Sequence, residues 1–358
     1  MTRNSLPAMT AMSQLACFRI EGDPHEMGRR LGELARPQFD AYMAQSSAWR
    51  RLRRWHGHPF VAALRAAALT AFPQYVAELD GMAHGLGWSA DDLFIWNCRG
   101  ELIHRTGDGC TTVAVATASH RAIAHNEDGD PYLLGPGHCF LVDAKPSGRP
   151  GFVSFCYPGS LPGHTFAVTR AGLAQTINNV RIVETVPGIP RMILARAVLD
   201  ADSLDAALSL LRATPSASGF HHTLGCAGDS RIVSVEVTAR RSSMIEVHGL
   251  YGHANHLVHP EQASEAQIVT ASSRDRQARL AQLLPREQSD VNEEALLPML
   301  RDRAPEGLPI YRDDPRDPDG ENTLATALLR IEDNGVAMRV HRSGHSVFER
   351  FVERSFMS

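Results

Sequence analysis

The sequence predicts an α+β protein in which helices are layered on antiparallel sheet. Apolar residues recur mainly at helical spacing through residues 1–105, and from residue 110 the spacing changes to period two. Helical spacing returns over 190–214, and strand patterns then resume. Such blocks of helix and strand favour layers of helix on antiparallel sheet over an alternating, parallel α/β fold.

The composition limits the possible functions. The chain has 358 residues, of which 43% are hydrophobic and 21% charged, and a net charge of −4. It is long enough for one large domain or two. The absence of a basic field argues against nucleic-acid or membrane partners. Lys145 is the only lysine, which removes the P-loop, Schiff-base and Ser-x-x-Lys chemistries.

The cysteines do not form a disulfide or zinc pattern. None of them belongs to a C-x-x-C pair. No secretory signal pattern and no apolar run of about 20 residues is present, so we expect a cytoplasmic protein with reduced thiols. The six cysteines are Cys17, Cys98, Cys110, Cys139, Cys156 and Cys226.

Turn and capping residues delimit the expected elements. Ser89 is typical of a helix start, and Gly87 of a helix end. Asn334-Gly335 is typical of a hairpin tip. The expected helices cover 23–45, 58–87, 89–103, 190–214 in two pieces, 272–284 and 292–303. The expected strands lie within 110–117, 121–127, 139–146, 151–159, 164–178, 221–249 and 322–344.

Cys110 is the best candidate for a reactive group. It opens a strand directly after "TGDG", where the period of the sequence changes. If the following hairpin turns at Ser119, Cys110 lies opposite Asp128, and cross-strand neighbours have Cβ atoms about 5 Å apart. The hairpin would then place a carboxylate beside the thiol and the backbone nitrogen of Cys110.

A thiol must lose its proton before it can act as a nucleophile. No local sequence marks any of the 17 histidines as a partner of Cys110. If the chain is cut between Gly109 and Cys110, however, the new α-amine becomes a general base beside the thiol. Gly109 suits such a cut because glycine permits strained backbone.

"DGCTT", followed eighteen residues after the cysteine by Asp128, resembles the N-terminal nucleophile (Ntn) hydrolases. The nearest branch is the acyl-CoA:6-aminopenicillanic acid acyltransferase (isopenicillin-N acyltransferase) family, and the choloylglycine hydrolases and penicillin V acylases are more distant. The resemblance covers nearly the whole chain. It includes "EGDPHEMGRRLGELA", "ELDGMAHGLGWSADDLFIWNCRGEL", "AGLAQTINNV", "ANHLVHP", "SSRDRQARL" and "IYRDDPRD…TLATAL".

The resemblance implies roles for particular residues. Cys110 would first attack the Gly109 carbonyl in an N-to-S acyl shift and then serve as the catalytic nucleophile. Asp128 would orient the freed amine, and Arg276 would lower the thiol pKa. Oxyanion or substrate contacts would come from Asn178 and Asn255, and tentative substrate contacts from Thr111, Thr112 and Arg312. Asn179 is an alternative to Asn178, and Arg279 to Arg276.

The implied fold is a four-layer αββα sandwich. Its helical N-terminal fragment, 1–109, would stay associated with the catalytic core, 110–358, after self-cleavage of a zymogen. The implied activity is cleavage or transfer of an acyl group at a small-molecule amide. The substrate would be an N-acyl amino acid, a small peptide-like amide or a β-lactam. No cofactor or metal is implied, but acyl-CoA could be a co-substrate and a homo-oligomer could form.

Two other hypotheses remain open at this point. A metal-dependent hydrolase would use the histidine-rich stretch "HGLYGHANHLVHP", which lacks an H-E-x-x-H pattern. A non-catalytic binding protein on the same scaffold would bind a ligand without turnover. The histidines of that stretch are His248, His253, His256 and His259.

Overall fold

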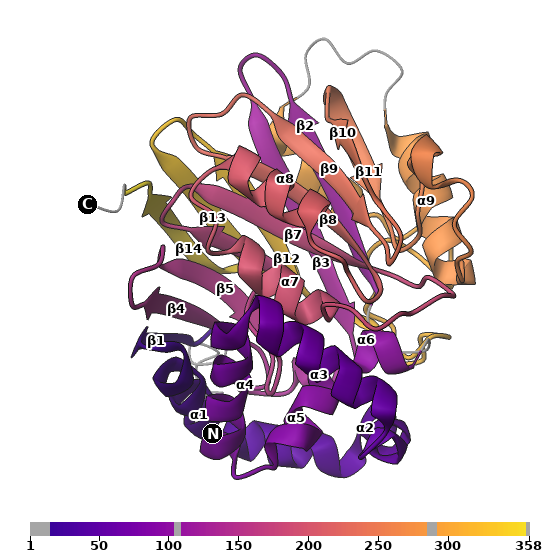
Figure 1. Ribbon diagram of the computed structural model, residues 1–358. Helices are drawn as coiled ribbons and strands as arrows, with labels where there is room; N and C mark the ends of the chain where they lie inside the picture. Colours follow the sequence, from indigo (N-terminus) through magenta and orange to yellow (C-terminus); the bar gives the residue numbers. More distant parts are fainter. Residues whose placement is uncertain (1–14, 104–108, 285–291, 356–358) are drawn as a thin grey trace, which may run out of the picture.

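The computed structural model describes residues 15–103, 109–284 and 292–355, which form two sheets and the helices that cover them (Figure 1). The α-helices are α1 (Pro24–Gln45), α2 (Ser47–Leu52), α3 (Pro59–Ala71), α4 (Pro73–Leu86), α5 (Ala90–Asn97), α6 (Arg99–Leu102), α7 (Arg191–Val198), α8 (Leu204–Ala213), α9 (Ala271–Leu283) and α10 (Leu296–Leu300). Short 3₁₀ turns lie at Arg53–Trp55, Pro131–Leu134, Pro260–Gln262 and Glu293–Ala295.

The eight-stranded sheet contains mostly antiparallel neighbours. Its order is β1 (Cys17–Gly22), β4 (Phe140–Pro146), β5 (Phe152–Cys156), β6 (Phe166–Thr169), β7 (Leu173–Val180), β8 (Gly219–Cys226), β9 (Ile232–Val237) and β10 (Ser242–Glu246). The six-stranded sheet has the order β11 (Gly249–His253), β2 (Cys110–Ala116), β3 (Arg121–Gly129), β12 (Asn322–Ile331), β13 (Gly335–Arg342) and β14 (His345–Glu353).

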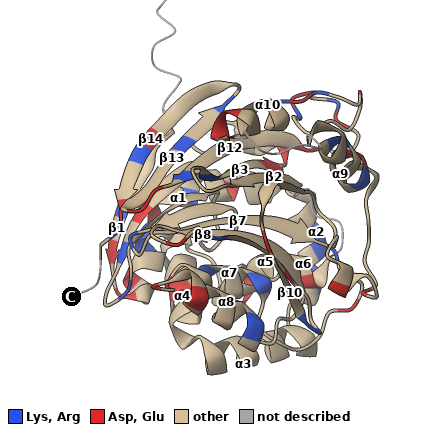
Figure 2. Ribbon diagram, turned by 90° about the horizontal axis from the view of Figure 1, so that it is seen from above, with Lys and Arg blue, Asp and Glu red and all other residues tan. Residues whose placement is uncertain are grey.

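The two sheets lie face to face with helices on both outer sides (Figure 2). Helices α7 and α8, together with the N-terminal helices, cover the eight-stranded sheet, while α9 and α10 cover the six-stranded sheet. Val113 and Ala124 of the smaller sheet pack in one apolar cluster with Leu280 and Leu300 of the covering helices. The expected α+β, four-layer αββα sandwich is therefore confirmed.

The N-terminal segment contains a strand that the sequence analysis missed. Helices α1–α6 match the expected helical segment, but Cys17–Gly22 forms β1 and pairs in parallel with β4 at the edge of the larger sheet. Six residues are too short for periodicity to separate a strand from the start of a helix. The segment expected to be mainly helical thus contributes backbone hydrogen bonds to the core sheet.

The register of the β2–β3 hairpin corrects the expected position of Asp128. Cys110 lies opposite Glu127, not Asp128, because residues 117–120 form a four-residue loop closed by Thr117 and His120. The expected turn at Ser119 is therefore displaced by half a residue. A register change of one residue moves each side chain to the other face of a sheet. Glu127 consequently shares the face of Cys110.

Helices α1 and α4 approach each other through glycines. A Cβ atom at Gly28 would lie 1.9 Å from the backbone oxygen of Glu78, and one at Gly81 would lie 2.0 Å from that of His25. Real Cβ atoms do not approach backbone so closely, so these positions require glycine. The close contact fixes the N-terminal helices as one unit.

We expect Gly81→Ala to lower the free energy of unfolding by about 1–3 kcal/mol, because the added methyl group forces the two helices apart. Chemical denaturation of the two proteins measures this difference. Alanine is otherwise favoured over glycine inside a helix by about 1 kcal/mol. An unchanged or higher stability would therefore contradict the packing described.

Candidate active site

Cys110 is buried at the first residue of β2 and is held through its backbone. Its amide nitrogen donates to Oδ1 of Asn255 at 2.9 Å. Its carbonyl oxygen accepts from Nη1 of Arg276 at 2.5 Å. The backbone of the expected nucleophile is thus fixed on both sides by two of the predicted site residues.

Arg276 links several of these groups from helix α9. Besides the Cys110 carbonyl, its guanidinium donates to Thr111 Oγ1 at 2.9 Å, to Asn255 Oδ1 at 2.6 Å and to Ser272 Oγ at 3.1 Å. Burial lowers the pKa of Arg276, while the nearby Asp128 raises it. A guanidinium stays charged under such shifts, so a fixed positive charge lies at the start of β2.

The alternative Arg279 lies elsewhere. Its guanidinium forms a two-pronged ion pair with Asp302, at 2.9 and 2.7 Å. Of the two arginines left open by the sequence analysis, Arg276 is the one that contacts Cys110.

Asp128 contributes to the site through its backbone. Its amide nitrogen donates to the carbonyl oxygen of Gly109 at 2.8 Å. Its buried side chain accepts from the Thr323 hydroxyl at 2.7 Å. Burial raises the pKa of Asp128, and the charges of Arg276 and Arg312 oppose that rise. The residue therefore polarises the carbonyl that precedes Cys110.

Gly109 is the last residue before β2, and residues 106–108, which precede it, lie outside the described residues. A Cβ atom at Gly109 would lie 2.5 Å from Oε2 of Glu321. Burial raises the pKa of Glu321 to about 7, while Arg312 lowers it through a 2.6 Å hydrogen bond. A larger residue at 109 would displace this carboxyl group.

Arg312, tentatively expected to bind substrate, is buried among protein partners. Its Nε and Nη2 atoms bond both carboxylate oxygens of Asp317, at 2.9 and 2.5 Å. It also donates to Ser272 at 3.0 Å and to Glu321. These contacts position the loop at 312–321 against the site.

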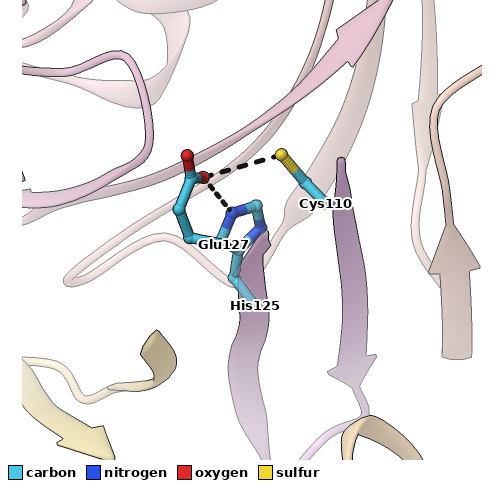
Figure 3. Close-up of side chains that lie close together, drawn as sticks. All are labelled: Cys110, His125 and Glu127. Carbon is cyan, nitrogen blue, oxygen red and sulfur yellow. Dashed lines mark hydrogen bonds and ion pairs between the residues drawn. The ribbon is translucent and has the colours of Figure 1, made fainter. Parts of the chain in front are cut away.

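Glu127 and His125 are site residues that the sequence analysis missed (Figure 3). Sγ of Cys110 lies 3.5 Å from Oε2 of Glu127, and the same oxygen lies 3.3 Å from Nε2 of His125. Burial lowers the pKa of His125 to about 3. The motif "HNED" carried the signal, but only the correct hairpin register assigns Glu127, rather than Asp128, to the face of Cys110.

The two candidate asparagines face different surroundings. Asn178 Oδ1 accepts from the Thr112 hydroxyl at 2.7 Å and contacts Nδ1 of His221 at 3.0 Å, in a polar network between the sheets. Asn179 lines the cavity at Cys110, and its backbone oxygen accepts from Asn255 at 2.9 Å. Of the two asparagines, Asn179 is therefore the one that lines the cavity beside the thiol.

Two hollows adjoin Cys110 and Gly109. The first is a small cavity of about 20 Å³. It is lined by Arg99, Cys110, Glu127, Tyr157, His164, Ile177, Asn179, Arg191, Met192 and Phe220. The second is a cleft of about 720 Å³ that reaches Gly109 and contains charges of both signs. Its charged residues are Arg51, Asp130, Arg181, Arg276, Asp319 and Glu321.

The histidine-rich stretch does not assemble a metal site within the described part of the chain. The ring of His253 bonds Glu236, the ring of His259 bonds Ser234 and Ser243, and His248 is exposed. Across residues 15–103, 109–284 and 292–355, the one set of three metal-ligating atoms within 4.8 Å of one another comes from Cys110, His125 and Glu127. The stretch 248–259 therefore does not support the metal-hydrolase hypothesis.

The four layers with a strand-initial cysteine define an Ntn-type fold. The chain belongs to the family described as acyl-coenzyme A:6-aminopenicillanic acid acyl-transferase, whose model matches residues 115–345. It is also 30% identical over 162 residues to the beta-alanyl-dopamine/carcinine hydrolase of Drosophila melanogaster. That match covers 40% of this chain and 41% of the relative, so the chain matches less than half the length of this curated protein.

Two solved structures show more distant similarity. One is the Caenorhabditis elegans N-acylethanolamine-hydrolyzing acid amidase ortholog, with a TM-score of 0.41, 11% identity and coverage of 62% of this chain and 92% of that one. The other is a mutant of the conjugated bile acid hydrolase from Clostridium perfringens, with a TM-score of 0.43, 8% identity and coverage of 68% and 92%.

No helix among the described segments is both long and apolar enough to cross a membrane.

We expect Arg276→Lys to lower the free energy of unfolding by about 2–4 kcal/mol, because lysine cannot replace the fork of hydrogen bonds to Cys110, Thr111 and Asn255. Arg279→Lys is the matched control, and its partly exposed ion pair should contribute little. Urea denaturation compares the two variants. Equal effects of the two substitutions would contradict the role given to Arg276.

A pH dependence follows from Glu321. Because its folded-state pKa is raised, the folded protein binds this proton more tightly than the unfolded chain, and the stability it contributes is lost as pH rises from about 4.5 through 7. The free energy of unfolding of Glu321→Gln should therefore exceed that of the unsubstituted protein by an amount that reaches about 1–3 kcal/mol between pH 5 and 8. The exposed Glu306→Gln variant is the control. If the free energies of unfolding of the unsubstituted protein and Glu321→Gln changed equally with pH, the raised pKa of Glu321 would be refuted.

Proposed function

We propose that the protein is an autoproteolytic cysteine Ntn amidohydrolase or acyltransferase that forms a thioester on Cys110. The observation that carries this proposal is the placement of the Gly109–Cys110 peptide. Asp128 N–H bonds the Gly109 carbonyl, and Asn255 Oδ1 accepts from the Cys110 nitrogen. Such contacts stabilise negative charge on a carbonyl oxygen and orient the departing nitrogen.

Self-cleavage would begin with attack of the Cys110 sulfur on the Gly109 carbonyl carbon. The S–C bond forms, the C–N bond breaks, and the thiol proton passes to the nitrogen, which becomes the free α-amine of Cys110. Water then hydrolyses the thioester, which leaves a carboxylate on Gly109 and regenerates the thiol. The amine, held by Asn255, can then accept the thiol proton when a substrate amide arrives.

The cleaved N-terminal fragment would remain bound to the core. Strand β1 is hydrogen-bonded to β4, and residues of α1, α4 and α5 share one apolar cluster with residues of the larger sheet. The fragment therefore acts as a structural partner rather than a released propeptide.

The substrate would be a small polar amide. The cleft at Gly109 offers arginines and carboxylates rather than an apolar channel for a long acyl chain. The Drosophila relative, named for β-alanyl-dopamine and carcinine, supports a small amine-bearing amide. Hydrolysis or transfer is decided by whether water or an amine reaches the thioester. Acyl-CoA would be the acyl donor of a transferase.

Intact-mass measurement tests the self-cleavage. We expect the purified protein to give two fragments split between Gly109 and Cys110, Cys110→Ala to give one chain of 39.2 kDa without activity, and Cys110→Ser to be cut slowly if at all. Cys17→Ala, which removes a thiol on β1, is the control and should be cut normally. An active enzyme that remains a single chain would overturn the proposal.

A further inference from the structure

Three buried side chains converge on one point, those of Cys110, His125 and Glu127 (Figure 3). The hydrogen bonds around them determine which of their atoms face that point. The amide group of Asn178 is oriented by its donation to the His253 carbonyl, so its Oδ1 atom is an acceptor. The Thr112 hydroxyl has one hydrogen, and at 2.7 Å from that oxygen it must donate it there.

The tautomer of His125 follows from this assignment. Thr112 Oγ1, having donated its hydrogen to Asn178, can only accept from Nδ1 of His125 at 2.8 Å. When the imidazole is neutral, its other nitrogen, Nε2, carries a lone pair. That lone pair faces Oε2 of Glu127 at 3.3 Å. Two acceptors therefore face each other in a buried site, and either a proton or a cation must lie between them.

The third group favours a cation. Cys110 Sγ lies 3.5 Å from the same carboxylate oxygen, and the three ligand atoms lie within 4.8 Å of one another. Zinc binds sulfur at about 2.3 Å and nitrogen or oxygen at about 2.0–2.2 Å, which makes neighbouring tetrahedral ligands about 3.3–3.6 Å apart. The distances from Oε2 of Glu127 to Sγ of Cys110, 3.5 Å, and to Nε2 of His125, 3.3 Å, fall in this range.

The contact of the second ring nitrogen of His125 also suits a metal site. A ligating histidine normally donates its second ring N–H to a fixed acceptor, as Nδ1 of His125 does to Thr112. The small cavity of about 20 Å³ that Cys110 and Glu127 line is also lined by Arg99 and Arg191 but not by His125, so it adjoins the three side chains rather than lying between them. It is too small for an organic substrate, which would instead enter through the cleft at Gly109.

We propose that Cys110, His125 and Glu127 form a binding site for a thiophilic divalent cation such as Zn²⁺. Binding displaces the thiol proton to solvent and occupies the sulfur lone pair, which leaves the fourth coordination position to water or to the α-amine of a cleaved Cys110. While the cation is bound, the sulfur of Cys110 cannot be acylated. The cation is thus a reversible inhibitor of the enzyme. This consequence rests on the proposed function, whereas binding of the cation does not require turnover.

Cobalt(II) provides a direct test because its bond to a thiolate gives a near-ultraviolet charge-transfer band. Titration of the full-length protein with Co²⁺ should produce this band at one equivalent, and Zn²⁺ should abolish it by displacement. Cys110→Ala should lose the band. His125→Ala and Glu127→Gln should each weaken Co²⁺ binding at least about 10-fold, as should Thr112→Val, which removes the acceptor of the His125 N–H.

Two controls separate this site from other ligands. His248→Ala removes an exposed histidine and should leave the titration unchanged, and circular dichroism establishes that each variant is folded. A folded protein without the band, or a band that persists in Cys110→Ala or His125→Ala, would overturn the proposal and leave a shared proton between His125 and Glu127. A cleaved protein without the band refutes only the cation site, whereas an uncleaved, inactive protein with the band refutes only the proposed enzymatic function.

Discussion

The buried guanidinium of Arg276 determines the geometry around Cys110. It donates simultaneously to the Cys110 carbonyl, the Thr111 hydroxyl and the Asn255 amide oxygen, and thereby joins helix α9 to the first residues of β2. Because the same Asn255 oxygen receives the Cys110 N–H, the backbone on both sides of the sulfur is held by one connected group. A buried cation of this kind is tolerated only where such partners satisfy it.

The two faces of the β2–β3 hairpin have different chemistry. Asp128 and Thr111 lie toward the arginines supplied by α9 and the 312–321 loop. Glu127 and His125 lie on the opposite face with the thiol and the polar network between the sheets. Alternation along a strand thus places the guanidinium groups of Arg276 and Arg312 on the side opposite to Glu127 and His125.

Much of the architecture could be predicted because its elements carry strong local signals. Asn334-Gly335 marks the β12–β13 turn correctly, and the change of period at Cys110 correctly marks the start of β2. Strand β1 could not be predicted in the same way, since its parallel partner lies more than one hundred residues away. Strand β14 was missed as well, because its exposed edge position gives a mixed burial pattern.

The site was predictable only to the precision of the hairpin register. The family resemblance named Cys110, Asn255 and Arg276, and these lie together. The sequence could not distinguish a turn at Ser119 from a loop of four residues, and this difference of one register position decides between Asp128 and Glu127 as the neighbour of the sulfur. Side-chain contacts across the sheets, such as Thr112 to Asn178, have no local signal at all.

The parallel pairing of β1 with β4 affects how the molecule would refold after cleavage. If the chain is severed at residue 109, the edge strand and its helices belong to a different polypeptide from the sheet they complete. Folding is unimolecular before the cut but requires two pieces to meet afterwards, so recovery from denaturation would then depend on concentration. The cleaved protein would then stay folded because its two pieces separate slowly, and not because they reassemble readily.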